Sequence, residues 1–379
     1  MQRAKAADKP VASLAGYTVA VATDRRRHPI AAMIEALGAR TVGVQAVRTV
    51  SQPDAAAVRA ATIEAVAQPV HEVVISSAFG LRAWLAEATR AGQVEALLAR
   101  FADARLLARD ARAADGLREL GLTQIWSTSA ATTEDLFRYL IAQPMVGRRV
   151  VAQLDTEPLR ELCHTLRAAG AGVVEVVTFQ SDPPNHTDVL RRLADQVAKR
   201  QIDAVVLTSQ ASARYLLDQA AADANTDEVL NALVSDVVPV CLGQLAAQPL
   251  RAKGVAPQVA VGAYAEELLE LLVEVLPRRA MHLRIGGLQV EVRGQALLVG
   301  GRLIAVQPGP IAVLRALAHH PGRVLSAGEI RGHVPGWAGV DDHAIEMAVS
   351  RLRRSLDGTD LDGTGLVQTV MKRGYRIAT

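Results

Sequence analysis

Two segments near the end of the chain decide its fold: Ser350-Arg-Leu-Arg-Arg-Ser-Leu356 and Val367-Gln-Thr-Val-Met-Lys-Arg-Gly-Tyr-Arg376. The first belongs to a predicted helix that begins near Asp341-Asp342. At about 100° per residue, its apolar residues share one buried face: Ile345, Val349, Leu352 and Leu356. The second segment is predicted to form a β-hairpin with Lys372-Arg373-Gly374 at its tip. An apolar-backed helix with outward donors, beside a basic hairpin, is a surface that the major groove of DNA accepts.

The residues before this helix complete a small domain. From Leu283 apolar residues recur at every second position, and Gly300-Gly301 makes a tight turn, so a small antiparallel sheet is expected. A helix follows from about Gly309 to His319, and a second opens with the capping box Ser326-Ala-Gly-Glu329. The order is therefore sheet, three helices and hairpin.

These segments resemble the winged-helix output domain of OmpR/PhoB-type response regulators, as does His320-Pro-Gly-Arg-Val-Leu-Ser326. The resemblance implies that Arg351 is the principal base reader and that Thr369 contacts phosphate. It also implies contacts with the DNA backbone from His343, Ser350, Arg353 and Arg354. Met371 stands where the family usually carries a wing arginine, so phosphate contact is expected from Lys372 and Arg373 instead.

Charge is distributed unevenly along the chain. The 379 residues carry a formal net charge of +3. Residues 277–379 contain 14 Lys and Arg against 8 Asp and Glu, a net of +6, so the remainder carries −3. This asymmetry indicates that a basic C-terminal domain binds an anionic partner and that the front part of the chain does not.

The front part of the chain repeats itself. Three landmarks recur at a nearly constant offset: Gly16-Tyr-Thr-Val and Gly147-Arg-Arg-Val, Val73-Val-Ile-Ser-Ser77 and Val205-Val-Leu-Thr-Ser209, Leu117-Arg-Glu-Leu-Gly121 and Leu250-Arg-Ala-Lys-Gly254. Each copy alternates short Val-rich runs with helical periods, which predicts a duplicated α/β unit with parallel strands covered on both faces.

Segments that contain proline mark the expected domain boundaries. Thr49-Val-Ser-Gln-Pro53 and Phe179-Gln-Ser-Asp-Pro183 are natural crossings between two lobes. We expect a disordered tail (1–13), a discontinuous lobe 1 (14–50 and 181–275), lobe 2 (51–179), a linker (276–282) and the winged-helix domain (283–379).

The order of these motifs resembles uroporphyrinogen-III synthase over residues 14 to 275. The resemblance implies two flavodoxin-like lobes that exchange strands and close on a linear tetrapyrrole, hydroxymethylbilane, held by loop amides and helix N-termini. Candidate ligand-binding residues are Arg25, Ser76, Ser77, Thr208, Ser209 and Gly243. For Arg25 a plain surface run from Arg25 to Arg27 is the favoured alternative, and for the four hydroxyl residues helix capping is the alternative.

This sequence differs from the synthase family at positions that the resemblance links to its activity. Ala246 replaces the Thr of the family's Gly-x-x-Thr-Ala turn, and the matching positions of the first copy are Asp110 and Ala113. Phe179 stands where a tyrosine is often found. We therefore assign no catalytic residue.

The leading hypothesis is a transcription regulator whose body senses a tetrapyrrole or another anionic metabolite. A genuine synthase with a DNA-binding appendage, and a body used only for dimerisation or protein contact, remain alternatives. Phosphorelay control is not expected, because Asp24 faces three arginines rather than a second acid. The expected partners are double-stranded DNA, the anionic ligand, and a second copy or partner regulator. No metal, cofactor or membrane segment is expected, and the location is cytoplasmic.

Overall fold

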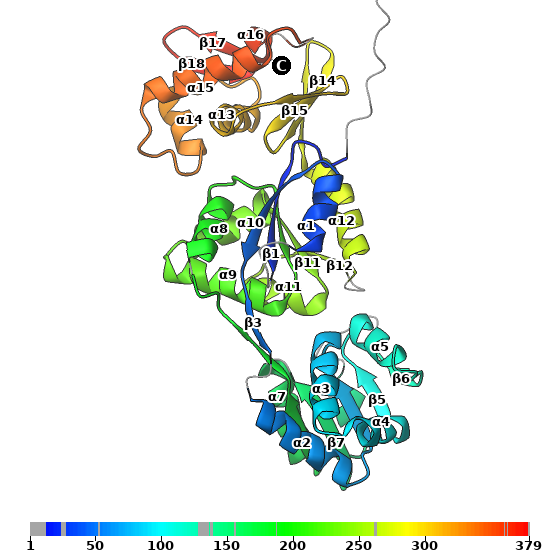
Figure 1. The fold of residues 1–379 in the computed structure, drawn as a ribbon. Coiled ribbons are helices and arrows are strands. Elements are labelled where there is room, and N and C mark those ends of the chain that lie inside the picture. Colours follow the sequence, from blue (N-terminus) through cyan, green and yellow to red (C-terminus); the bar gives the residue numbers. More distant parts are fainter. Residues whose placement is uncertain are drawn as a thin grey trace, which may run out of the picture.

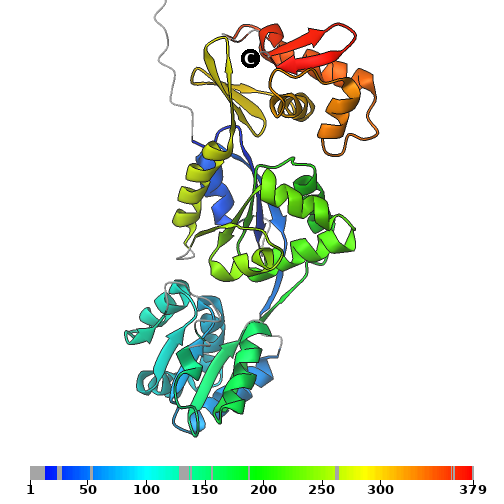
Figure 2. The ribbon, with the colours of Figure 1, turned by 180° about the vertical axis from the view of Figure 1, so that it is seen from behind.

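The computed structural model describes residues 13–23, 28–51, 54–127, 136, 139–154, 157–186, 188–260, 264–359, 361 and 363–377. They form three bodies in a row, with lobe 1 between lobe 2 and the C-terminal domain (Figures 1 and 2). Except for Ser13, the expected tail of residues 1–13 lies outside the described residues.

Lobe 1 is a five-stranded parallel sheet of order β12-β11-β10-β1-β2. Its strands are β1 (Thr18–Thr23), β2 (Arg40–Gln45), β10 (Ala204–Leu207), β11 (Val238–Leu242) and β12 (Gln258–Ala260). Alternate residues of β1 enter two cores: Val19 and Val21 on one face, Ala20 and Ala22 on the other. The first face is covered by α1 (Pro29–Ala36) and α12 (Ala265–Arg279). The second is covered by α8 (Asp188–Ala198), α9 (Gln210–Ala222), α10 (Thr226–Ser235) and α11 (Gln244–Arg251).

Lobe 2 repeats this plan with the order β6-β5-β4-β7-β8. Its strands are β4 (Glu72–Ile75), β5 (Arg105–Ala108), β6 (Ile125–Trp126), β7 (Arg149–Leu154) and β8 (Gly172–Val177). One face packs against α2 (Ala55–Ala67), α3 (Ala78–Arg90), α4 (Val94–Asp103) and α5 (Ala111–Arg118). The other packs against α7 (Glu157–Ala168), through Cys163 and Leu166.

Each lobe combines the first half of one copy with the second half of the other. Strand β7, which begins at Arg149, repeats β1, which begins at Thr18. Strand β10, which begins at Ala204, repeats β4, which begins at Glu72. Counted in chain order, the strands of lobe 1 follow the flavodoxin-like order 2-1-3-4-5, and those of lobe 2 follow it when each strand is numbered as its counterpart in lobe 1. Both lobes are thus flavodoxin-like, as the resemblance implied.

Two antiparallel strands connect the lobes at the predicted crossings. β3 (Arg48–Ser51) pairs with β9 (Phe179–Asp182), and Arg48 forms a 2.6 Å ion pair with Asp182. The carboxyl ends of β2 and β8 lead into this ribbon, so the carboxyl ends of both sheets are turned toward each other (Figure 1). We call them the facing edges.

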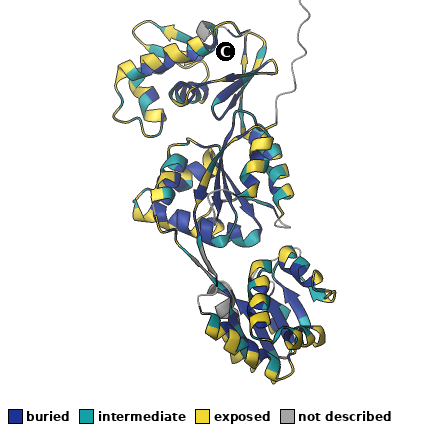
Figure 3. Ribbon diagram, in the orientation of Figure 1, coloured by how far each residue is buried: buried dark blue, intermediate teal, exposed yellow. Residues whose placement is uncertain are grey.

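The C-terminal domain has the predicted sheet, three helices and hairpin, with one short helix before the hairpin that the sequence did not predict. The antiparallel sheet contains β13 (Met281–Ile285), β14 (Leu288–Arg293), β15 (Ala296–Val299) and β16 (Arg302–Ala305). The helices are α13 (Pro308–Ala318), α14 (Ala327–His333), α15 (Asp342–Ser355) and the short α16 (Gly363–Leu366), and β17 (Val367–Val370) pairs with β18 (Gly374–Ile377). Figure 3 shows that this domain, like each lobe, has its own buried interior.

The connection into this domain is shorter than the expected linker of residues 276–282. Helix α12 continues to Arg279 and β13 begins at Met281, so Ala280 alone separates them. Pro277 lies in the last turn of α12, where its ring removes one backbone hydrogen bond without ending the helix. In the part of the chain that the structure describes, no helix is long and apolar enough to span a membrane.

Candidate functional sites

Helix α15 presents the predicted outward face. Asp341 caps it by accepting a 2.8 Å hydrogen bond from the Ala344 amide, and its apolar side is buried in the core of the domain. The residues exposed on the opposite side are His343, Glu346, Met347, Ser350, Arg351 and Arg354. Arg351 and Arg354 therefore point to solvent, where a nucleic acid could meet them.

Arg353 lies between this helix and the hairpin. Its Nε and Nη2 donate to the carbonyl oxygen of Val367 at 3.1 and 2.7 Å, and Nη2 also donates to Oγ1 of Thr369 at 2.8 Å. The Thr369 hydroxyl accepts this bond and keeps its own hydrogen free to donate, and its contact with a phosphate stays a prediction. The resemblance implies contact of Arg353 with the DNA backbone, but in this structure its guanidinium holds the hairpin against α15.

The hairpin tip carries the expected cations on a strained turn. Met371 is 83% exposed, and Lys372 and Arg373 are exposed beside it. Lys372 has a φ of +58° and Gly374 a φ of +128°. A Cβ on Gly374 would lie 2.0 Å from the carbonyl oxygen of Leu325, so only glycine lets the hairpin reach the turn before α14.

Helix α14 starts with the predicted capping box. The Glu329 amide donates to Oγ of Ser326, and the Ser326 amide donates back to Oε2 of Glu329. At the other end, Arg331 donates to the carbonyl oxygen of Val340 at 2.7 Å and pairs with Asp342 at 3.1 Å. These two contacts of Arg331 stabilise the turn between α14 and α15.

At the facing edge of lobe 2, Gln153 organises the candidate serines. Its Oε1 accepts from the amide and hydroxyl of Ser76 and from the amide of Ser77, at 2.9 to 3.1 Å. Ser76 is fully buried, whereas Ser77 caps α3 by accepting from the Gly80 amide. Gln153 also donates to Thr178, the residue before β9, so it links this turn to the ribbon between the lobes. The sequence alone did not single out Gln153.

The facing edge of lobe 1 is built differently. Thr208 donates to the carbonyl oxygen of Ala22 at 3.3 Å, and Ser209 caps α9 in a capping box with Ser212. Gly243 precedes α11 with a φ of +91°, and no side chain caps that helix. Its counterpart Asp110 in lobe 2 caps α5 with its own carboxylate, which accepts from the Ala113 amide at 2.8 Å.

Some expected features lie outside these contacts. Arg25 is outside the described residues, and Ala246 and Ala113 are both buried. Among the described residues, no group of three His, Cys, Asp or Glu side chains could hold a metal ion. Cys163 and Cys241 are buried, and burial raises the pKa of Cys241 to about 12.

Comparison with known proteins identifies both parts. The family model "Uroporphyrinogen-III synthase HemD" matches residues 28–270, more than half of the chain. The chain belongs to the uroporphyrinogen-III synthase family. A second model, "Transcriptional regulatory protein, C terminal", matches residues 301–377.

Individual relatives and solved structures are similar to parts of this chain. A mutant uroporphyrinogen III synthase from Thermus thermophilus has a TM-score of 0.55 at 24% identity, over 67% of this chain and 96% of that one. At this identity the likeness concerns the fold. YjjA of Bacillus subtilis (strain 168), described as uncharacterized, is 27% identical over 53% of this chain and 76% of its own. The transcriptional activator CadC of Escherichia coli (strain K12) is 36% identical over 77 residues, which are 20% of this chain and 15% of CadC.

The two assignments together define the protein at a coarse level. It is a DNA-binding transcription regulator that carries an OmpR/PhoB-type winged-helix domain on a uroporphyrinogen-III synthase-like body. Double-stranded DNA is the partner of the winged-helix domain.

Proposed function

We propose that the synthase-like body binds a small anionic metabolite between its facing edges, with a tetrapyrrole as the first candidate, and that this ligand, rather than phosphorylation, controls DNA binding. The observation that carries the proposal is the opposition of two flavodoxin-like carboxyl edges, with the ribbon of β3 and β9 connecting the lobes (Figure 2). In open α/β sheets ligands bind outside the carboxyl ends, at the point where strand order reverses. That point lies between β1 and β10 in lobe 1 and between β7 and β4 in lobe 2.

The candidate residues lie at those two points. Ser76 and Ser77 follow β4, and Thr208 and Ser209 follow β10. Helices α3 and α9 begin directly after them, so their N-terminal amides support the binding of negative groups. Arg25, which follows β1, remains a candidate partner for a carboxylate.

The two edges are not equivalent toward an anion. Asp110 places a carboxylate of the protein at the N-terminus of α5, and that charge repels a ligand carboxylate. Gly243 leaves the N-terminus of α11 without any side-chain cap. We therefore expect the carboxylates of the ligand to bind mainly to lobe 1.

A thermal unfolding scan of the full chain tests ligand binding. Hydroxymethylbilane and uroporphyrinogen III serve as probes, and citrate serves as a general polyanion. Binding to the folded state raises the melting temperature. If no probe shifts the transition and the chain associates through its body, dimerisation or protein contact is the better function.

A matched pair of variants on α11 tests the position of the anion. Gln244→Glu adds a carboxylate in the first helical turn, where Gln244 already accepts from Arg251 at 2.7 Å. We expect it to weaken ligand binding about 2- to 5-fold, since a charge near a helix end is worth roughly 0.3–1 kcal/mol. Gln248→Glu, one turn farther along, serves as the control. Equal effects of both variants would place the anion elsewhere.

Control of DNA binding is tested by linkage. The ligand is titrated calorimetrically into the full chain with and without a duplex selected from a random-sequence library. If the ligand tightens DNA binding, the duplex must tighten ligand binding by the same factor. Identical ligand affinities in the two titrations would show that the body does not control DNA binding through this ligand.

A further inference from the structure

The start of lobe 1 is covered by β14 of the winged-helix domain. Tyr17, 3% exposed, donates to Oε1 of Glu291 at 3.0 Å. Arg293 donates to the carbonyl oxygen of Ala15 at 2.9 Å and places its guanidinium 5.3 Å from the centroid of the Tyr17 ring. Glu291 and Arg293 also pair with each other at 2.9 Å, and both are largely buried. The buried charges of Glu291 and Arg293 thus pair within β14, and both also contact polar or aromatic groups of lobe 1.

A second contact joins lobe 1 to α13. Asp203, directly before β10, accepts from the Thr18 amide at 2.7 Å, and its other oxygen accepts from Nη2 of Arg315 at 3.2 Å. Burial raises the pKa of Asp203, and among the groups that lower it Arg315 has the largest influence and Arg40 a smaller one. Arg315 is therefore the main positive charge that offsets the cost of burying the Asp203 carboxylate.

Two glycines let the backbones meet at these contacts. A Cβ on Gly294 would lie 1.9 Å from Oδ2 of Asp203, and one on Gly16 would lie 2.8 Å from Cβ of Ala296. The Gln295 amide also donates to the carbonyl oxygen of Gly16 at 2.9 Å. The two domains therefore touch without space for an added methyl group.

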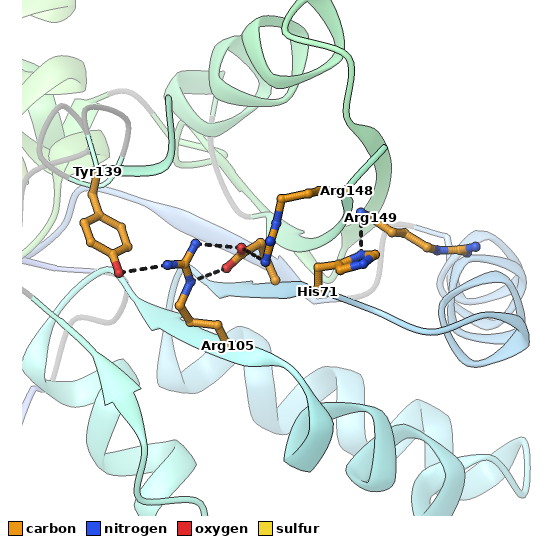
Figure 4. Close-up of polar contacts among 6 residues, drawn as sticks. His71, Arg105, Tyr139, Arg148 and Arg149 are labelled. Carbon is orange, nitrogen blue, oxygen red and sulfur yellow. Dashed lines mark hydrogen bonds and ion pairs between the residues drawn. The ribbon is translucent and has the colours of Figure 1, made fainter. Parts of the chain in front are cut away.

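Lobe 2 serves as an internal comparison, because no other domain among the described residues covers its matching edge (Figure 1). There His71 stands at the place of Asp203, and its Nδ1 accepts from the Arg149 amide at 2.9 Å (Figure 4). Arg149 begins β7 as Thr18 begins β1, so the same bond recurs in both lobes. Lobe 2 makes it with an imidazole, and lobe 1 with a carboxylate.

The neighbouring arginines differ as well. In lobe 2 the fully buried Glu72 pairs with Arg105 at 2.7 Å and with Arg148 at 2.6 Å, both from the same lobe (Figure 4). The matching positions in lobe 1 are Val238, which begins β11 as Arg105 begins β5, and Tyr17, which precedes β1 as Arg148 precedes β7. Neither carries a positive charge. The guanidinium that pairs with Asp203 comes from the winged-helix domain instead.

We infer that the amino-end edge of lobe 1's sheet is a docking surface built for the chain's own winged-helix domain, and that the two stay docked as one body with and without DNA. The single residue between α12 and β13 favours the same arrangement. Docking leaves α15 uncovered, since the His343 side chain is 76% exposed. Relative motion is then left to lobe 2, on the ribbon of β3 and β9.

Distances between spin labels on the full chain test this inference. The native cysteines are buried, so labels go to cysteines introduced at the exposed Glu95 of lobe 2, Asp218 of lobe 1 and Arg302 of the winged-helix domain. We expect a narrow Asp218–Arg302 distribution that DNA leaves unchanged, and a broader Glu95–Asp218 distribution. A broad Asp218–Arg302 distribution in the wild type would overturn the inference, whatever the variants do.

Variants then identify the contact responsible. Arg315→Met leaves Asp203 buried without its main partner and is expected to broaden the Asp218–Arg302 distribution. Asp203→Asn combined with Arg315→Met removes both charges and should restore most of the narrow distribution. Arg323→Met, which removes the ion pair with Glu329 inside the winged-helix domain, is the control and should change nothing. Equal distributions in all variants would show that this ion pair does not hold the domains together.

Discussion

Tyr264, the residue before α12 in lobe 1, donates a 2.6 Å hydrogen bond to Oδ2 of Asp115 on α5 of lobe 2. The contact lies on the side of the facing edges away from β3 and β9 (Figure 1). Within the part of the chain that the structure describes, the lobes are therefore joined by a covalent ribbon on one side, and this exposed hydrogen bond links them on the other. Such a bond is weak enough to open and close.

Tyr264→Phe should favour separated lobes. An exposed hydrogen bond contributes about 1 kcal/mol, so the ratio of joined to separated lobes should fall about fivefold. The Glu95–Asp218 label distance measures this ratio, and Tyr215→Phe is the control, because Tyr215 is buried within lobe 1. An unchanged distance distribution would show that the bond does not restrain the lobes.

The same bond should depend on pH. The hydrogen bond from Tyr264 lowers the pKa of Asp115 below 3.8, with a further contribution from Arg118. Since an acid with a lowered pKa stabilises the joined form only while ionised, the stabilisation is present above pH 3.8 and is lost as the pH falls through the lowered value. Over that window the wild type should approach Tyr264→Phe. A constant difference between them would contradict the assignment.

Arg351 and Lys372 should differ in what they contribute to DNA binding. Arg351→Ala should reduce discrimination at one base pair by about 1 to 3 kcal/mol if the contact is bidentate. Lys372→Ala should weaken all sequences about equally and reduce the salt dependence by about one phosphate contact. Binding to a panel of single-base variants at several salt concentrations separates the two. An unchanged sequence preference in Arg351→Ala would mean that α15 is not the recognition helix.

Arg353 should act through the hairpin rather than through a phosphate. Arg353→Met removes the bonds to Val367 and Thr369, so DNA affinity should fall while the salt dependence stays that of the wild type. The neighbouring Arg354→Met is the comparison, because Arg354 is exposed and its loss should reduce the salt dependence by about one contact. If Arg353→Met reduced the salt dependence of DNA binding as much as Arg354→Met does, Arg353 would also contact a phosphate.

Gly374→Ala should displace the hairpin. The added Cβ meets the carbonyl oxygen of Leu325, so we expect a loss of more than about 2 kcal/mol in stability, together with weaker DNA binding. Gly358→Ala is the matched control, because Gly358 has a φ of +74° but nothing within 4 Å of an added Cβ. It should cost about 1 kcal/mol from backbone strain alone. Equal losses in chemical denaturation would mean that the contact with Leu325 is unimportant.

The body should show little cyclisation of hydroxymethylbilane. Asp110 puts a negative charge at the N-terminus of α5, where the resemblance implies a carboxylate-binding turn. Ala246 lacks the hydroxyl of its family's threonine, and Phe179 lacks that of a tyrosine. Analysis of the product isomers made by the full chain checks this expectation. A rate comparable to that of a dedicated synthase would favour the alternative function, an enzyme with a DNA-binding appendage.

Local patterns predicted most of the fold. The period of apolar residues gave the buried face of α15, the Ser326–Glu329 spacing gave a real capping box, and the nearly constant offset between repeated motifs gave two sheets of equal order. Each of these signals depends on residues that are close in sequence or on repetition itself. Both are visible without a structure.

The contacts between bodies could not be predicted in the same way. Asp203 and Arg315 are 112 residues apart, and no periodicity relates them. The same holds for Tyr264 and Asp115, and for Gln153 and the serine turn that it organises. One signal was present: the duplicated copies differ at His71 and Asp203, although both precede a matching strand. The carboxylate of Asp203, which lobe 2 lacks at this position, marks the sheet edge that contacts the winged-helix domain.

The exchange of halves between the copies also sets an order of assembly on the ribosome. Lobe 2 has all of its strands once Val177 has emerged, but β1 must wait for β10, its central neighbour, and for β11 and β12 up to Ala260. At a synthesis rate of about 5–20 residues per second, β1 and β2 remain without most of their sheet for roughly 10 to 40 s. The first strands to be made are thus among the last to be buried, and during that interval their Val-rich edges are exposed to other chains and to chaperones.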